Sequence, residues 1–205
     1  MAKIAPIKYP IDLYPQVAKN ESAQNALKAL QEASAAINEA LGKVTDPRAL
    51  SQAIRSKAAT AVKAATTSHG YVHAASESKA KLMREQLKKR SEFEKEIREH
   101  VAAQKNPAAA VHQLIAAGDQ DGVAAIFRAP SYLSGLDDEA VAALYQRAKV
   151  RFTPELAQQE AEADDGVQRL SRAIEVFNKE IARLDRQIAG SDEQIAANLV
   201  KASAA

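Results

Sequence analysis

Residues 156–188 read LAQQEAEADDGVQRLSRAIEVFNKEIARLDRQI, and this stretch decides the fold of the chain. Large apolar side chains recur in it at alternating steps of four and three residues, and Glu160 is the one charged residue on the same stripe. A heptad repeat of this kind predicts a long helix that packs along its length against other helices, as in a coiled coil. The repeat occupies positions Leu156, Glu160, Ala163, Val167, Leu170, Ile174, Phe177, Ile181, Leu184 and Ile188.

The composition extends this prediction to the whole chain of 205 residues. Alanine makes up about a fifth of it, glycine and proline number 7 each, and aromatic residues contribute 4%. Alanine has the highest helix propensity, and Glu, Lys, Gln and Arg follow closely. We therefore predict an all-α fold whose many alanines allow its helices to approach closely.

Capping residues and glycines indicate where the helices begin and end. Asn20 precedes the first expected helix and Gly42 ends it, while Thr153-Pro154 opens the heptad helix. A turn or a kink is expected near Gly70, and a break at Gly190. The expected helices span 21–41, 47 to the region of Gly70, 71–105, 107–117, 120–128, 138–150 and 154–188, with a short tail helix after 190.

The two longest expected helices, 71–105 and 154–188, have nearly equal length and are joined by a block of short helices. This pattern favours an elongated antiparallel helical bundle, or coiled-coil hairpin, with a small head. The expected organisation is an arm (1–20), long bundle helices (21–105), a head (106–153), and the heptad helix with its tail (154–205).

Residues 1–20 combine three prolines, which exclude a continuous helix, with many apolar side chains. We expect an extended arm that either folds back on its own helices or docks on a neighbouring subunit. The sequence is compatible with heptad seams that close within one chain and with seams that close between chains, and it does not determine the oligomeric state. The residues expected to make protein contacts are Ile7, Tyr9, Leu13 and Tyr14 of the arm, and Ile174, Phe177, Ile181 and Leu184 of the seam.

Patterns that carry catalytic or metal chemistry are missing from the sequence. Cysteine is absent. His69 and His73 are four residues apart, but no third metal ligand follows them at a spacing typical of a metal site. Nucleophile-elbow, P-loop and dinucleotide-binding motifs are also absent. We therefore expect no enzymatic activity, no cofactor and no metal site.

The net charge of +2 gives no strong bias toward nucleic acid or an anionic membrane. Within the basic stretch 79–90, Lys81, Arg84 and Lys88 share one helical face and are the candidates for contact with phosphate. Acidic residues follow in 92–99 and no aromatic residue alternates with the basic ones, so a solvated charged face is the simpler expectation. No apolar run is long enough for a membrane span, and the first residues do not resemble a signal peptide.

The segment APSYLSGLDDE (129–139), followed by RFTPE (151–155), resembles stretches in small helical proteins encoded among the structural genes of tailed bacteriophages. The resemblance covers less than a fifth of the chain and contains no catalytic or binding residues to transfer. It implies a virion or assembly component, located in the virion or the host cytoplasm.

Together these features predict a non-enzymatic structural or assembly protein, such as a scaffold, connector or accessory subunit. It would act through helix packing and arm docking, on itself or on a larger assembly. The alternative is a cytoplasmic adaptor or regulatory protein that binds nucleic acid through 79–90.

Overall fold

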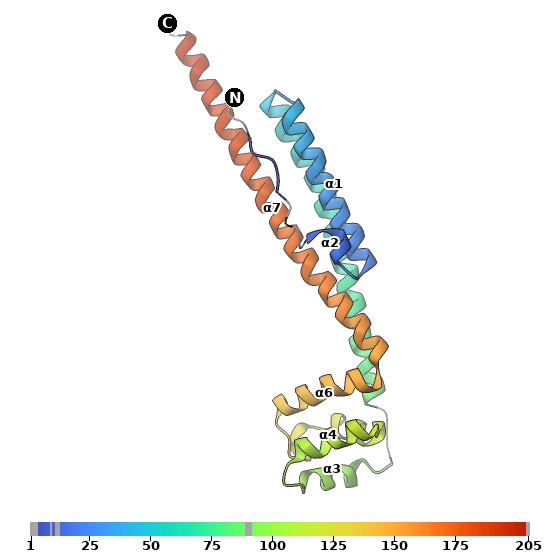
Figure 1. The fold of residues 1–205 in the computed structure, drawn as a ribbon. Helices are drawn as coiled ribbons and strands as arrows, with labels where there is room; N and C mark the ends of the chain where they lie inside the picture. Colours follow the sequence, from blue (N-terminus) through green and yellow to red (C-terminus); the bar gives the residue numbers. More distant parts are fainter. Residues whose placement is uncertain (1–3, 9, 11–12, 89–91, 204–205) are drawn as a thin grey trace. The chain divides into compact units, whose positions relative to one another are not determined.

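The computed structural model describes residues 4–8, 10, 13–88 and 92–203, and for 191, 192 and 194–203 it describes the backbone alone. All regular structure in these residues is helical, which confirms the all-α prediction (Figure 1). Seven α-helices and two short 3-10 helices follow one another along the described chain. They are η2 (Pro15–Val17), α1 (Glu21–Lys43), α2 (Pro47–Leu87), α3 (Glu94–Ala102), α4 (Pro107–Ala117), α5 (Gln120–Phe127), η3 (Ser131–Ser134), α6 (Asp138–Phe152) and α7 (Pro154–Ser203).

The starts of several helices are determined by local side-chain caps, as the sequence predicts for Asn20. The side-chain oxygens of Asn20, Asn106, Asp119 and Asp137 each accept a hydrogen bond from the backbone amide three residues further on. These bonds satisfy amides that have no partner inside the helix. Gly118 ends α4 with a φ of 78°, a left-handed conformation that glycine adopts without steric cost.

Two compact units make up the chain, and their boundaries lie inside α2 and α7. The first unit is Met1–Ala74 with Glu162–Ala205, and the second unit is Ala75–Ala161. The sequence suggested boundaries between helices, at 20/21, 105/106 and 153/154. Each observed unit instead groups residues whose side chains are buried together, and such a group can begin or end inside a helix.

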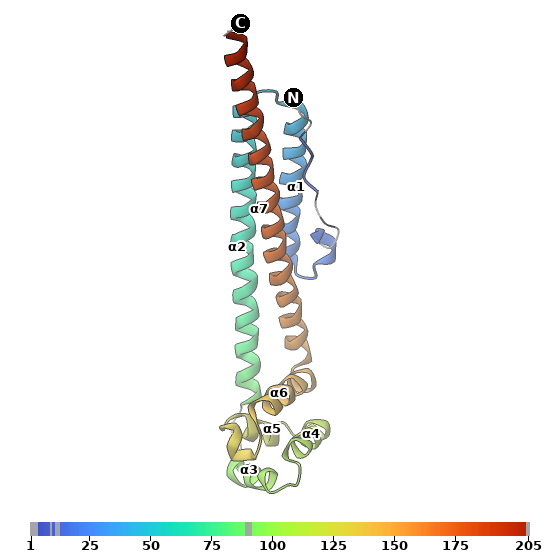
Figure 2. The ribbon, with the colours of Figure 1, turned by 90° about the vertical axis from the view of Figure 1, so that its left-hand side faces the viewer.

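In the first unit, α1, α2 and α7 run alongside one another (Figure 2). Side chains from all three helices form one core. All ten positions of the heptad repeat, from Leu156 to Ile188, are buried or half-buried. One face of α1 is buried as well, with Ala23, Leu27, Leu30 and Ile37 in the core. Buried alanines on α2 allow the facing helices to approach closely. The fully buried members with the largest side chains are Leu13, Leu27, Leu30, Ile37, Ile54, Leu170, Phe177 and Leu184.

A second, separate core lies in the second unit, where α3, α4, α5 and α6 are gathered (Figure 2). Leu87, at the end of α2, and Val101, at the end of α3, belong to this core together with Phe127 of α5. Two arginines hold α3 against α5: Arg128 forms an ion pair with Glu94, and Arg98 Nη1 donates to the backbone carbonyl oxygen of Ala125 at 3.1 Å.

The expected turn or kink near Gly70 is wrong, because α2 runs without interruption from Pro47 to Leu87. Ala61, Ala65 and Val72 are buried on one stripe that spans Gly70 in register. Glycine inside a helix costs about 1 kcal/mol relative to alanine. The packing on both sides of Gly70 outweighs this cost.

The expected helix 71–105 is also wrong, because α2 ends at Leu87 and α3 begins at Glu94. A continuous helix would place Leu87 and Val101 about 21 Å apart along its axis. Ending the helix allows both side chains to enter the same core. Burial in the second unit therefore outweighs the high helix propensity of the sequence after Leu87.

Helix α7 does not break at Gly190 but continues to Ser203, so the expected break and separate tail helix are also wrong. No atom lies within 4 Å of the position that a Cβ would occupy on Gly190, so no neighbouring group interrupts the helix there. The remaining boundaries differ from expectation by one or two residues: α1 ends at Lys43, α5 at Phe127 and α6 at Phe152.

Two glycines inside helices, Gly70 and Gly166, are expected to respond in opposite ways to substitution by alanine. Gly70→Ala is expected to stabilise the protein by about 0.5–1 kcal/mol, because helix propensity improves and nothing lies within 4 Å of the new Cβ. Gly166→Ala is expected to lower the melting temperature instead. Its Cβ would lie 3.2 Å from Ala23 Cβ and 3.3 Å from Asn20 Cβ, and these atoms move only with their backbone. Thermal unfolding followed by circular dichroism measures both shifts, and a stabilising Gly166→Ala would contradict the close packing.

Candidate functional site

The N-terminal segment packs against helices of its own unit. Ile7 and Leu13 are buried in the core of the first unit, and Tyr14 is half-buried. The Ile7 backbone donates to Asn38 Oδ1 at 2.7 Å and accepts from Asn38 Nδ2 at 3.2 Å. Of the two arrangements expected for the arm, this is the one in which it folds back. Tyr9 lies outside the described residues.

A second attachment joins the same segment to α7. Arg183 Nη2 donates to the carbonyl oxygens of Ala5 and Pro6, at 3.0 and 3.2 Å. Glu180 holds the guanidinium in place, because its Oε2 accepts from Arg183 Nη2 at 2.9 Å. The segment is thus hydrogen-bonded to α1 through Asn38 and to α7 through Arg183.

The four seam residues expected to make protein contacts face the core of their own unit. Phe177 and Leu184 are fully buried, while Ile174 and Ile181 are half-buried against the same core. Phe177 and Leu184 are thus covered by side chains of their own unit, and Ile174 and Ile181 keep part of their surface exposed.

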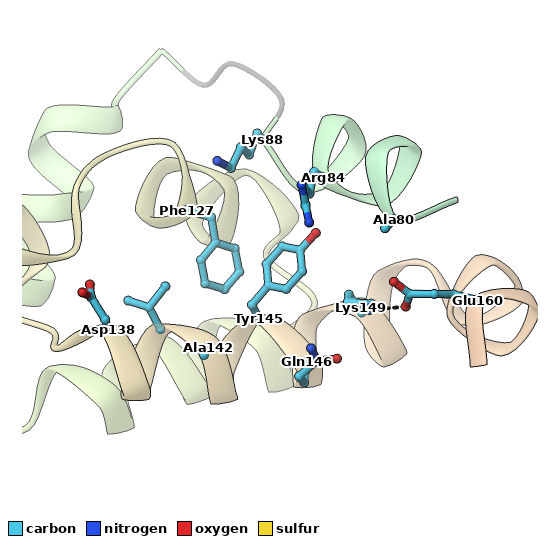
Figure 3. Close-up of a pocket in the computed structure, with 11 residues that line it drawn as sticks. Ala80, Arg84, Lys88, Phe127, Asp138, Ala142, Tyr145, Gln146, Lys149 and Glu160 are labelled. Carbon is cyan, nitrogen blue, oxygen red and sulfur yellow. Dashed lines mark hydrogen bonds and ion pairs between the residues drawn. The ribbon is translucent and has the colours of Figure 1, made fainter. Parts of the chain in front are cut away.

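The basic stretch lies at the end of α2. Lys81, Arg84 and Lys88 are all exposed, but only Arg84 and Lys88 line a cavity of about 410 Å³ in the second unit (Figure 3). Lys89 and Arg90 lie outside the described residues. Within the described part of the chain, neither Arg84 nor Lys88 forms an ion pair.

We call this space the Arg84 cavity. Its walls come from α2, α5, α6 and the start of α7. The polar residues that line it are Arg84, Lys88, Asp138, Tyr145, Gln146, Lys149 and Glu160. The apolar lining consists of Ala80, Phe127, Val141 and Ala142.

Lys149 and Glu160 form a nearly buried ion pair at one side of the cavity (Figure 3). Their side chains are only 9% and 15% exposed, and Lys149 Nζ also lies 6.0 Å from the centre of the Tyr145 ring. Glu160 is the charged residue of the heptad stripe, and its ion pair with Lys149 joins α7 to α6. The charge of Lys149 is thus neutralised within the protein.

The hydroxyl oxygen of Tyr145 is buried and makes no hydrogen bond of 3.5 Å or less among the described residues, although the Arg84 guanidinium lies close enough to interact with it. Burial raises the pKa of this phenol above its usual value, and the nearby Arg84 guanidinium partly opposes the shift. Figure 3 shows the Tyr145 hydroxyl directed toward Arg84. The ring is held from the other side by Phe127, edge to face, with 5.4 Å between the ring centres.

Asp138 lies at the opposite end of the cavity from Arg84 (Figure 3). It occupies the first turn of α6, where the helix dipole favours a negative charge, and it accepts a hydrogen bond from Ser131 Oγ at 2.7 Å. The neighbouring Asp137 caps the helix. Both acids thus have structural roles, as the capping pattern of the sequence predicts for Asp137.

Sequence analysis identified the cationic face of α2 but missed Tyr145 and Lys149 as its neighbours. These two residues are four apart on α6 and so share a face of that helix. The one signal that could have pointed to Lys149 was Glu160, a single carboxylate on an apolar seam.

The histidines and the acidic residues do not form a metal site in the described ranges. His69 Nε2 lies 2.9 Å from Ser171 Oγ, and its ring stacks on His73 with 6.4 Å between the ring centres. Among the residues that the structure describes, no three His, Asp or Glu side chains converge closely enough to hold an ion.

Comparisons of the chain with models of protein families, with curated proteins and with solved structures found no match. In the described part of the chain, no helix combines the length and the apolar character needed to cross a bilayer.

Proposed function

We propose that this protein is a non-enzymatic structural or assembly protein that works through contacts between its helices and a partner protein. In this proposal the first unit is a coiled-coil bundle with its arm folded on, and the second unit is the head that contacts the partner. The setting is a bacteriophage virion or its assembly pathway, in the virion or the host cytoplasm.

Large apolar side chains are exposed mainly in the second unit, and this distribution supports the proposal. Among the described residues, only Tyr71 in the first unit is a large apolar side chain that is exposed. The other five are Leu82, Phe93, Tyr132, Leu133 and Val150, all of the second unit. Apolar side chains that a monomer leaves in water are candidates for a protein interface.

Two of these side chains are adjacent on η3 and lie within the segment that resembles phage proteins. Tyr132 is 72% exposed and Leu133 is 46% exposed. Tyrosine is enriched at interfaces because its ring is apolar and its hydroxyl can remain hydrated. The resemblance and the exposed side chains therefore point to the same part of the second unit.

The test is absolute mass in solution, by light scattering after size exclusion. We expect the protein to form a multimer and the double variant Tyr132→Ser, Leu133→Ser to have a lower mass. Tyr71→Ser is the matched control, since Tyr71 is 70% exposed in the first unit, and its mass should not change. A monomer at every concentration, or a multimer that Tyr71→Ser disrupts equally, would contradict self-association through the second unit.

Binding of nucleic acid through 79–90 remains the alternative function. It has less support, because Arg84 and Lys88 line a cavity, and of the three predicted contacts only Lys81 lies outside that cavity. Binding to DNA that falls steeply with added salt would favour this alternative.

A further inference from the structure

The Arg84 cavity combines positive charge, unused hydrogen-bond donors and an apolar wall in one place. Its volume of about 410 Å³ lies within the range of roughly 300–1,000 Å³ that is typical of small-molecule sites. All of its lining residues belong to the second unit. The exposed residues on η3 do not line the cavity, so binding of a ligand here would be independent of the proposed protein contact.

The charges in the cavity favour an anion with two negative charges. Lys149 is neutralised by Glu160, and Asp138 is exposed at the far end, where solvent screens it. Arg84, in the last turn of α2, and Lys88, the residue that follows the helix, remain, and neither has an ion-pair partner in the described part of the chain. Two uncompensated cations on one wall match a dianion better than a carboxylate.

The donors of the cavity favour a phosphate group. The Arg84 guanidinium is a fork of N–H donors, and Lys88 supplies an ammonium group. The buried Tyr145 hydroxyl adds an O–H donor, because the neighbouring Arg84 can only donate to its oxygen and cannot accept from it. A phosphate monoester carries a charge of about −1.5 to −2 at pH 7 and presents three acceptor oxygens. Arginine and lysine are the side chains that proteins most often use to bind such a group.

The remaining wall suits a small apolar body attached to the phosphate. Tyr145 and Phe127 lie edge to face, and Val141 and Ala142 continue the apolar surface along α6. Inorganic phosphate would leave this surface exposed to water, whereas an aryl or short alkyl group would cover it.

We propose that the Arg84 cavity binds a small organic phosphate monoester, with Arg84, Lys88 and Tyr145 holding the phosphate and the Phe127 side of the cavity covering the apolar body.

Isothermal titration calorimetry on the full chain tests the proposal, with phenyl phosphate as the probe. Phenyl phosphate is expected to bind more tightly than inorganic phosphate, which lacks the ring, and than benzoate, which carries a single charge. Arg84→Gln is expected to weaken binding at least about tenfold, because a hydrogen-bonded charge is lost. Tyr145→Phe keeps the ring but removes the donor, and should weaken binding by about fivefold to tenfold.

Lys81→Gln is the matched control, because Lys81 is exposed on the same helix and does not line the cavity. Its affinity for phenyl phosphate should equal that of the unchanged protein. Thermal unfolding of each variant shows whether the fold is retained, and Arg84 is exposed enough that we expect no loss.

Three results would overturn the proposal. The first is no binding of phenyl phosphate at millimolar concentration to a folded protein. The second is an equal loss of phenyl phosphate affinity in Lys81→Gln and Arg84→Gln, which would indicate diffuse attraction of anions. A single-stranded oligonucleotide that competes with phenyl phosphate, and whose binding Lys81→Gln weakens as much as Arg84→Gln does, would indicate the same. The third is benzoate or inorganic phosphate binding as tightly as phenyl phosphate.

Discussion

Phe177→Ala is expected to lower the free energy of unfolding of the first unit by about 3–5 kcal/mol. Phe177 is fully buried and is the largest of the fully buried side chains, in a core that α1, α2 and α7 share. Removing its ring takes away buried apolar surface and leaves a cavity that helices on several sides cannot close. Urea denaturation followed by circular dichroism measures the loss.

The matched control is Tyr71→Ala, an aromatic side chain of the same unit that is 70% exposed. It should change the unfolding free energy little, because an exposed ring has few contacts to lose. Hydrogen exchange adds a second readout: protection should fall in the first unit, while the separate core of the second unit keeps its own. An unchanged urea midpoint for Phe177→Ala would show that the seam does not stabilise the chain.

Lys149→Met is expected to destabilise the second unit by about 3–5 kcal/mol, because it leaves the carboxylate of Glu160 nearly buried without its partner. The penalty comes from the orphaned charge and not from the loss of lysine itself. The double variant Lys149→Met, Glu160→Met should therefore recover most of the loss. Unfolding free energies of the two single variants and the double variant give the coupling between the residues.

Lys179→Met provides the comparison, since Lys179 also pairs with a glutamate, Glu175, but both side chains are more than 60% exposed. Water screens that pair, and we expect no measurable change in the unfolding midpoint. If Lys149→Met were equally harmless, the pair between α6 and α7 would not contribute to the stability of the second unit.

Much of the fold could be predicted because it depends on local chemistry. Asn20, Asn106 and Asp137 cap helices with their own side chains, and the heptad spacing of 156–188 determines which face of α7 is buried. These signals act over three to seven residues and can be read without knowing what lies nearby.

The errors arose where distant contacts decide the outcome. Gly70 is a poor helix former, yet α2 continues through it, because residues on both sides of it are buried in one core. The chain leaves its helix after Leu87 although no proline or glycine is present there. The end of α2 is favoured there because Leu87 and Val101 are buried in the same core, and local helix propensity contains no information about such long-range burial.

The candidate site shows the same division. Arg84 and Lys88 could be found from their spacing on α2, but Tyr145 and Lys149 are about sixty residues further along the chain. Only the fold of the second unit brings α6 to the end of α2. The cavity is therefore a property of the fold and has no local sequence motif.

The interrupted first unit has a consequence for how the protein is made. The second unit is one continuous stretch, Ala75–Ala161, whereas the core of the first unit needs α1 together with the part of α7 that follows residue 161. During synthesis the N-terminal part of a chain emerges first, but here its core partners are translated last. The second unit is thus expected to fold on the ribosome while α1 and the N-terminal segment still wait for α7. Proteolysis of ribosome-bound chains stalled before and after α7 has emerged would detect this order as late protection of Ile7 and Leu13.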